Sequence, residues 1–230
     1  MKTLLCLRKF TGAVVITALA LCAFPSVLPL FAYEDKLTTA EIEGALESAR
    51  LNEVFLQYLA TIQTYDPERA TRLGLHGSDY LLTARSQESA TSQLEAIRRL
   101  RAKLGEIRKD SMSPNLRVDY EILDRMLEAD VYELKNLGLP VRRPQQYLDP
   151  LFLVYQMMSK DYEDYNTRAS NALSRLKQFP SVLEQAERNL SHPPEIWTRQ
   201  AIKQAGDALN YVSDFVPVFR DYTRYDPILK

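Results

Sequence analysis

The chain has 230 residues, of which 46% are hydrophobic, and it carries 29 basic against 30 acidic side chains. A formal net charge of −1 excludes the strongly basic surface that nucleic-acid-binding proteins use. The length corresponds to roughly one to one and a half ordinary domains, so we expect a packed core.

The first 32 residues predict export from the cytoplasm. Lys2, Arg8 and Lys9 precede a run without charge over residues 10–32, and Glu34 follows it directly. A basic start, an apolar run and a polar exit are typical of a signal peptide. The run is also long enough to be an uncleaved anchor in the inner membrane.

We therefore expect residues 1–32 to be a signal peptide or signal anchor, and the protein to be periplasmic or otherwise exported to the cell envelope. Membrane contact is expected only through this segment. Both cysteines, Cys6 and Cys22, lie within it, so the mature chain has no disulfide and depends on packing. Leu21 occupies a position where lipidation requires a small residue, which disfavours a lipid anchor at Cys22.

Three long amphipathic helices are expected over residues 38–64, 86–107 and 113–134, because apolar residues recur at spacings of three and four. Each begins at a residue that caps helices well: Thr38, Ser86 and Ser113. The side chains expected to face inward are Ile42, Leu46, Ala49, Leu51, Phe55, Tyr58 and Ile62 in the first helix, Leu94, Ile97, Leu100, Leu104 and Ile107 in the second, and Leu116, Tyr120, Leu123, Leu127, Val131 and Leu134 in the third.

Shorter helices are expected after residue 138, where glycine and prolines break the pattern. They cover about 151–159 and 162–178, and Pro180 is expected to open another helix that ends near residue 190. A last helix should run from 195 to about 215, where Pro217 ends or kinks it. No segment alternates polar and apolar residues as strands do, so residues 33–230 should form an all-α, antiparallel multi-helix assembly.

The histidines do not form a metal-binding motif. A zinc peptidase helix needs two histidines one turn apart with a glutamate beside the first, and the chain has only His76 and His192. His76 with Asp79, and His192 with Glu195, could each lend two ligands to a shared site. A catalytic zinc takes three protein ligands, so loop histidines are the simpler interpretation, with His76 in a turn hydrogen bond. We assign no catalytic and no metal-binding residue in this chain.

Other common chemistries also lack their motifs. The sequence contains no G-x-S-x-G elbow for a serine nucleophile and no glycine-rich phosphate loop. A basic run ends in Lys103 and includes Arg98, Arg99 and Arg101, but Glu95 lies four residues before Arg99 and favours a solvated helix face. We therefore expect no nucleic-acid partner.

Aromatic residues cluster in two places. The first cluster is Tyr147, Tyr155, Tyr162 and Tyr165, and the second is Tyr211, Phe215, Phe219, Tyr222 and Tyr225. Packing between helices is the main interpretation, and a binding groove or interface is the alternative. Near the end of the chain we expect Tyr211, Phe215, Val218, Phe219 and Tyr222 to form an exposed apolar patch.

The stretch over residues 65–82 combines a short helix with a polar turn. Asp66 and Pro67 are suited to start the helix, Gly74 is suited to stop it, and residues 76–79 follow as His-Gly-Ser-Asp. This arrangement resembles the N-terminal signature of the bacterial domain-of-unknown-function family 885 (DUF885).

The likeness continues through the chain from about Asn52 to Asp207. Residues 113–123 resemble the family's arginine and aspartate-tyrosine helix start, and residues 143–147 resemble its proline-tyrosine stretch. Further positions that fit the family pattern are Arg168, Leu176, Phe179, Pro180, Leu183, Ala186, Asn189, Leu190, Pro193, Pro194, Ala201 and Ile202.

The resemblance implies a helical, zinc-peptidase-like fold whose metal motif and general base lie in a C-terminal half, beyond Lys230. It implies that this chain is the N-terminal, non-catalytic portion, apparently truncated and inactive alone. No cofactor is expected in the chain itself, and zinc is expected only in the C-terminal half, supplied in cis or in trans. The residues that would face the substrate channel are His76, Asp79 and Tyr80.

An alternative function comes from a different class. The chain could be an independent helical binding or scaffold protein of the bacterial cell envelope. The DNA directly downstream discriminates the two, because a continuation that encodes a His-Glu motif favours the peptidase-like protein and an intergenic gap favours the scaffold.

Overall fold

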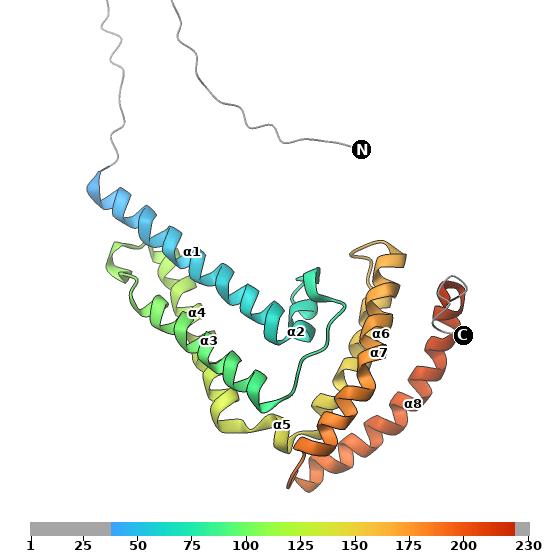
Figure 1. Cartoon of the computed structure of the whole chain (residues 1–230). Helices are drawn as coiled ribbons and strands as arrows, with labels where there is room; N and C mark the ends of the chain where they lie inside the picture. Colours follow the sequence, from blue (N-terminus) through green and yellow to red (C-terminus); the bar gives the residue numbers. More distant parts are fainter. Residues whose placement is uncertain (1–37, 224–230) are drawn as a thin grey trace, which may run out of the picture. The chain divides into compact units, whose positions relative to one another are not determined.

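The computed structural model of the chain describes residues 38–223, and for residues 211–223 it describes the backbone alone. The expected export segment over residues 1–32 lies outside the described residues. Within the described part every regular element is a helix, which confirms the all-α prediction (Figure 1). None of the helices described there combines the length and the apolar character needed to cross a membrane.

The described residues form eight α-helices joined by short connections and single helical turns. The α-helices are α1 (Thr39–Tyr65), α2 (Pro67–Arg72), α3 (Gln87–Gly105), α4 (Pro114–Tyr132), α5 (Leu139–Arg142), α6 (Asp149–Ser159), α7 (Tyr165–Asn189) and α8 (Glu195–Thr223). The 3-10 turns are η1 (His76–Ser78), η2 (Lys109–Ser111) and η4 (Pro144–Tyr147), and a π-helical turn, η3 (Glu133–Leu137), extends α4.

The predicted caps start the three long helices. The Thr38 hydroxyl accepts from the Glu41 amide (3.3 Å), and the Glu41 carboxylate accepts from the Thr38 amide (2.7 Å), so α1 begins with a complete capping box. The Ser86 and Ser113 hydroxyls cap α3 and α4 in the same way by accepting from amides three residues on. These side chains satisfy amide groups that have no partner within the helix.

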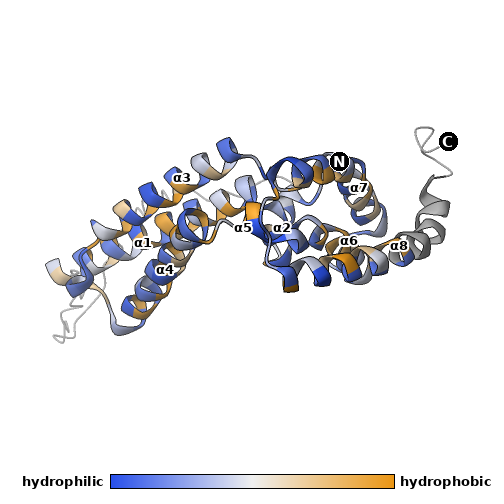
Figure 2. Cartoon of the chain, turned by 90° about the horizontal axis from the view of Figure 1, so that it is seen from below, coloured by the Kyte–Doolittle hydropathy of each residue, from blue (hydrophilic) through white to orange (hydrophobic). Residues whose placement is uncertain are grey.

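Helices α1, α3 and α4 pack around the main hydrophobic core. Each carries apolar residues along one side and polar residues along the other (Figure 2). The core contains most of the predicted stripes of α3 and α4, without Leu94, and three positions of the predicted stripe of α1. These core residues are Leu51, Tyr58, Ile62, Ile97, Leu100, Leu104, Ile107, Tyr120, Leu123 and Leu127. The predicted positions Leu116, Val131 and Leu134 pack against it and are partly buried.

Four positions of the α1 stripe were predicted wrongly. Ile42, Leu46 and Phe55 are 54%, 49% and 41% exposed, Ala49 is also exposed, and Val54 is buried instead. The reason is a close approach at Gly44, where a Cβ atom would lie only 2.8 Å from the Ser111 carbonyl oxygen. The contact turns a different side of α1 toward η2.

Glu47 lies on this packed side and is fully buried. Its carboxylate accepts from the Arg108 amide (3.3 Å) and pairs with the Arg50 guanidinium (3.1 Å). A buried carboxylate is stable only with such partners, so this end of α1 packs through a glycine and an ion pair rather than through aliphatic side chains.

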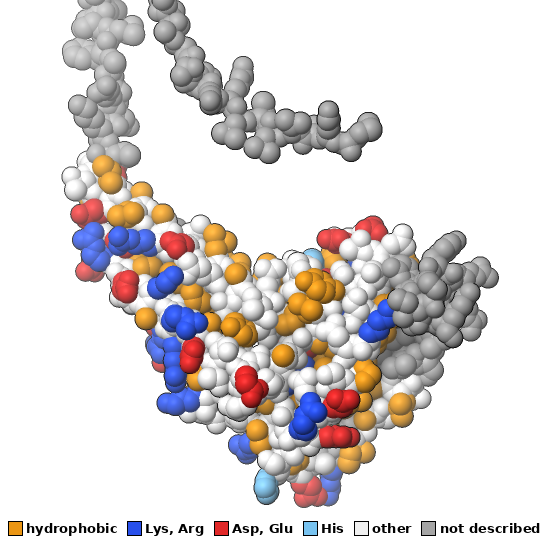
Figure 3. All heavy atoms as spheres, in the orientation of Figure 1, with side chains coloured by type: hydrophobic (Ala, Val, Ile, Leu, Met, Phe, Trp, Pro, Cys, Tyr) orange, Lys and Arg blue, Asp and Glu red, His pale blue; other side chains and the backbone are white. Residues whose placement is uncertain are grey.

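The basic run of α3 is a solvated face, as predicted. Arg98 and Arg99 are exposed, and Arg99 lies 3.8 Å from Glu95. Arg101 donates to Asp124 of α4 at 3.1 Å. In Figure 3 basic and acidic side chains mix along the flank that α1, α3 and α4 occupy in Figure 1.

Helix α7 runs unbroken through Pro180, so the prediction that Pro180 opens a new helix was wrong. A proline inside a helix removes one backbone hydrogen bond. Here one face of α7 is held by tertiary contacts on both sides of the proline: Arg175, Gln178, Val182, Gln185 and Asn189. These contacts outweigh the local preference of the proline.

Helices α6 and α7 pack on a second, smaller apolar cluster. Its buried members are Val154, Met157, Ala169 and Ala172. Helix α8 contacts η4 and α7, with Ala201 and Ala208 buried.

Helix α8 continues past Pro217 to Thr223, so the end predicted near residue 215 was wrong. The expected apolar patch of Tyr211, Phe215, Val218, Phe219 and Tyr222 lies outside the described side chains.

Candidate functional site

The turn that follows α2 is built as the sequence predicts. The Asp66 carboxylate caps α2 by accepting from the Arg69 amide (3.0 Å), and Pro67 occupies the first turn, where its missing N–H has no consequence. Gly74 adopts a φ of +81°, in the left-handed region that favours glycine, and ends the helix. This reversal leads directly into η1, which carries His76 to Ser78.

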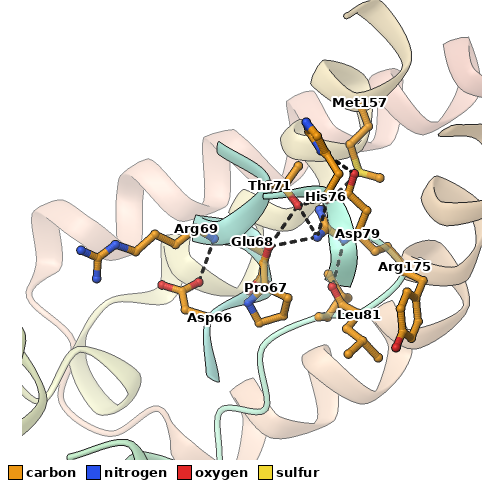
Figure 4. A network of polar contacts seen from close by, with 12 residues as sticks. Asp66, Pro67, Glu68, Arg69, Thr71, His76, Asp79, Leu81, Met157 and Arg175 are labelled. Carbon is orange, nitrogen blue, oxygen red and sulfur yellow. Dashed lines mark hydrogen bonds and ion pairs between the residues drawn. The ribbon is translucent and has the colours of Figure 1, made fainter. Parts of the chain in front are cut away.

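Asp79 is the centre of a buried polar network (Figure 4). Its side chain is fully buried, and its Oδ1 accepts from the Thr71 hydroxyl at 2.5 Å. Its Oδ2 accepts from the Tyr162 hydroxyl at 2.8 Å and lies 2.9 Å from Nδ1 of His76. A buried carboxylate with three hydrogen-bond donors is suited to fix the orientation of its neighbours.

Arg175 of α7 supplies the positive charge of this network. Its side chain is also fully buried, and one terminal nitrogen lies 4.0 Å from Asp79. The guanidinium donates to the Thr71 hydroxyl (2.7 Å) and to the carbonyls of Leu81 (2.9 Å) and Pro67 (3.2 Å). Burial lowers the pKa of Arg175, although the nearby Asp79 carboxylate acts in the opposite direction. An arginine keeps its proton in a protein, so a positive charge is buried beside the Asp79 carboxylate.

His76 is held in one orientation with one edge accessible. Its ring stacks on the Tyr162 ring with centroids 3.7 Å apart and planes 10° apart, and 24% of its side chain is exposed. When Nδ1 donates to Asp79, the other nitrogen, Nε2, carries the lone pair. No hydrogen bond joins Nε2 to any of the residues in the described part of the chain. The imidazole can therefore accept a proton or a hydrogen bond from outside the network.

The Tyr162 hydroxyl is a fixed donor. Burial raises its pKa above the ordinary tyrosine value, and the hydrogen bond to Asp79 adds to that rise. The phenol is accordingly neutral at physiological pH and keeps Asp79 Oδ2 occupied from one side while His76 occupies it from another. This shared acceptor is what couples the ring stack to the buried ion pair.

The three predicted channel residues lie in different environments. His76 and Asp79 contact each other, which confirms the expected turn hydrogen bond of His76. Tyr80 is 50% exposed, and its backbone carbonyl accepts from the Gln178 side-chain amide at 2.7 Å. Asp79 is buried, so its action is to position His76, whereas His76 and Tyr80 are accessible.

A strap of extended chain, residues 80–85, follows the turn along α7. Side chains of one α7 face hold its backbone. Gln178 donates to the Tyr80 carbonyl and accepts from the Leu82 amide (3.1 Å), and Gln185 accepts from the Arg85 amide (2.7 Å). Asn189 donates to the Arg85 carbonyl at 2.5 Å. The strap fixes the position of the turn relative to α7.

Sequence reasoning missed Thr71 and Arg175, and it singled out Tyr162 only as a member of an aromatic cluster expected to pack between helices or to line a groove. One signal was available for Arg175: it falls on the same helical stripe as Ala172 and Val182, both of which are buried. A charged residue in an apolar stripe needs a buried partner, which points to a network. Tyr147, of the same aromatic cluster, is a core residue, and Tyr155 and Tyr165 are exposed.

No metal centre is apparent within residues 38–210. No three of the potential metal-ligating side chains described there come close enough together to bind an ion. His192, the second histidine, is exposed in the connection between α7 and α8, where its φ of +55° places it in the left-handed region.

Comparison with known proteins gives one family and one fold. The model of the family "Bacterial protein of unknown function (DUF885)" matches residues 67–226. A solved structure of a candidate lipoprotein of unknown function from Shewanella oneidensis is similar in fold, with a TM-score of 0.64 and 21% sequence identity. The similarity covers 76% of this chain and 31% of that one, so the chain spans about a third of the longer protein. The curated proteins contain no match.

Proposed function

This chain belongs to the DUF885 family of bacterial proteins, and from that premise we propose that it is an exported, non-catalytic helical portion of a zinc-peptidase-like protein. The proposed role of the His76–Tyr80 turn is to line a substrate channel. The zinc and the general base would come from a C-terminal half, joined in cis or bound in trans. The much greater length of the Shewanella relative supports an arrangement in which this fold is one portion of a larger protein.

The observation that carries the proposal is the fixed imidazole of His76. A buried ion pair, a ring stack and a shared carboxylate hold a single side chain whose outer edge is accessible. Burying a charge pair contributes little to stability on balance, so such a network is better explained by the geometry it imposes. A preorganised acceptor beside an exposed tyrosine is suited to orient a polar substrate.

The proposed role is positional rather than chemical. His76 Nε2 would accept a hydrogen bond from an N–H or O–H group of the substrate, and Tyr80 would provide an aromatic surface beside it. Asp79 and Arg175 would act through His76. A catalytic zinc with three protein ligands would be held by the other half.

The experiment is reconstitution. The chain is purified with and without the segment of a longer DUF885 protein that follows the matched region. We expect zinc binding and peptide hydrolysis only when both parts are present, and we expect His76→Ala to raise KM while leaving kcat nearly unchanged. His192→Ala is the matched control and should have no effect. Hydrolysis by the chain alone, with one tightly bound zinc that is lost in a His76→Ala/His192→Ala double variant, would refute the proposal.

The exported location is tested separately. A fusion to a phosphatase that is active only in the periplasm, joined after Thr64, should be active because the charge asymmetry of residues 1–34 directs the following chain outward. An inactive fusion of full length would contradict export.

The second candidate is an independent binding or scaffold protein of the cell envelope. Exposed apolar side chains on α4, Val118 and Ile122, with Met126 beside them, favour this alternative because they form an apolar groove on the surface. A stable complex with an envelope protein that contains no peptidase motif, combined with failure of the reconstitution, would favour the scaffold.

A further inference from the structure

A cavity of about 400 Å³ lies on the other side of α2 from the Asp79 network. In Figure 4 Arg69 and Asp66 project from α2 away from Thr71 and Asp79, and both line this cavity. Its remaining walls come from the strap, the start of α3, the end of α4 with η3, and the segment from α5 to α6. A cavity of this size is within the range that binds small molecules.

Two ion pairs in the wall are already complete. The Arg69 guanidinium donates to both oxygens of Asp130 (2.9 and 3.1 Å). The Glu68 carboxylate accepts from Arg85 (2.9 Å), and both of those side chains are nearly buried. These four groups neutralise one another and hold the wall together, so they leave no charge for a ligand.

Three further charged groups line the cavity and form no ion pair with any residue in the described part of the chain: Asp66, Arg72 and Glu133. The Asp66 carboxylate is already used as the cap of α2, where it accepts from the Arg69 amide (3.0 Å) and the Thr83 hydroxyl (3.4 Å). Arg72 and Glu133 have no such partner among the described residues. Partial burial and the nearby Asp130 carboxylate raise the pKa of Glu133, which is the sign of a carboxylate without enough positive charge around it. Arg143 and Asp149, also in the wall, pair loosely at 3.5 Å with both side chains exposed.

From these groups we propose that the cavity is a binding site for a small zwitterion, a molecule with one carboxylate and one ammonium group. Arg72 would bind the carboxylate with its planar fork, and Glu133 would bind the ammonium. A ligand with both charges matches both groups at once, whereas an anion or a cation alone would leave one of them without a partner. The completed ion pairs of the wall would set the orientation of the ligand without contributing net charge.

The proposal is independent of the channel proposed for His76. It needs neither zinc nor a second half, because Arg72 and Glu133 belong to elements that enclose the cavity within this chain. Failure of the binding experiment would leave the channel proposal untouched, and failure of the reconstitution would leave this site untouched.

The test uses a series of amino acids that differ in the distance between their two charges. Glycine, 4-aminobutanoate and 6-aminohexanoate are titrated against the purified full chain by calorimetry, with hexanoate and hexylamine as ligands that carry one charge. We expect one length to bind best and the singly charged ligands to bind at least about tenfold more weakly, since each lost contact is a hydrogen bond to a charged group.

Charge-removing variants identify the two groups. In Arg72→Gln the zwitterion should bind no better than the amine, and in Glu133→Gln no better than the carboxylate. Arg188→Gln and Glu184→Gln are matched controls, because this exposed pair on α7 lies outside the cavity wall and should leave binding unchanged. Circular dichroism verifies that the variants fold.

Two results with the parent chain, and one with the variants, would overturn the proposal. One is the absence of binding by every zwitterion at millimolar concentration to the folded chain. The other is equal binding of the zwitterion and hexanoate, which would make the cavity a site for simple anions only. Unchanged binding in both Arg72→Gln and Glu133→Gln would likewise move the ligand away from this cavity.

Discussion

Two regions of this protein are held together in opposite ways. Helices α1, α3 and α4 enclose aliphatic and aromatic side chains, among them Leu104 and Leu127, which are fully buried. The region around α2, the turn and α7 instead buries Arg175 and Asp79 together with a small apolar cluster. The first kind of contact is non-directional and stabilises by area, whereas the second fixes angles and distances. The difference supports the proposal that the second region carries the functional site.

The contrast also explains how the two regions differ in their accessible polar side chains. In α3 the apolar side chains face the core, and the charged side chains lie on the solvated face, where they form ordinary surface ion pairs. The polar network instead presents one imidazole in one orientation.

The largest loss is expected from Arg175→Met. The substitution keeps the approximate length of the side chain but leaves the Asp79 carboxylate buried without its opposite charge, and the carbonyls of Pro67 and Leu81 lose a donor. Breaking a buried pair in this way costs about 3–5 kcal/mol. Urea unfolding measures the change. Arg188→Met, at an exposed arginine of the same helix, should cost less than about 0.5 kcal/mol. Equal effects at both positions would remove the distinction between the two regions.

A comparable loss of stability is expected from an apolar substitution in the core that α1, α3 and α4 enclose. Leu123→Ala removes a side chain that is 3% exposed and should cost about 2–5 kcal/mol. Its neighbour Ile122 is 54% exposed, and Ile122→Ala should change stability by less than about 1 kcal/mol. The two unfolding curves, recorded side by side, test which side of α4 faces the core.

An alkaline pH should remove the stability that the Tyr162 hydroxyl contributes to the polar network. Burial and the hydrogen bond to Asp79 raise the pKa of Tyr162, so above pH 10 the unfolded chain loses this phenolic proton while the folded chain keeps it. Stability from this group is complete below pH 10 and declines as the pH rises further. Between pH 8 and pH 11 the free energy of unfolding should therefore fall by about 1 kcal/mol less in Tyr162→Phe than in the parent chain. Tyr80→Phe, at an exposed tyrosine, is the control and should follow the parent.

The smallest effect concerns the strap. Gln185→Ala leaves the Arg85 amide without its acceptor and should cost about 1 kcal/mol. Hydrogen exchange of the Arg85 amide should become about tenfold faster, while amides of α3 keep their rates. The exposed neighbour Glu184 provides the control Glu184→Ala. Faster exchange throughout the molecule would mean that the strap belongs to the cooperative core.

The sequence predicts what is decided locally. Capping at Thr38 and the stripes of α3 and α4 lie within one helix each and are confirmed. The link between His76 and Asp79 spans three residues and could also be expected. Tyr162 contacts Asp79 from 83 residues away, a distance along the chain at which periodicity carries no information.

The errors have the same origin. The apolar residues of α1 cover more than one side, and the close contact at Gly44 with the chain near Ser111 decides which side is buried. Pro180 was expected to interrupt α7, but contacts to the strap, 94–104 residues away in sequence, hold the helix on both sides. Local preference is overruled where long-range contacts are numerous.

The most direct test of the account is the tautomer of the neutral His76 ring, measured by nitrogen NMR of the imidazole. The network predicts a single tautomer with the proton on Nδ1, donated to Asp79, and the lone pair on Nε2. His192, which is exposed, serves as the internal reference in the same spectrum and should average between forms. In Asp79→Asn the His76 signals should move toward those of His192. A proton on Nε2 of His76, or averaging equal to that of His192 in the parent chain, would contradict the account.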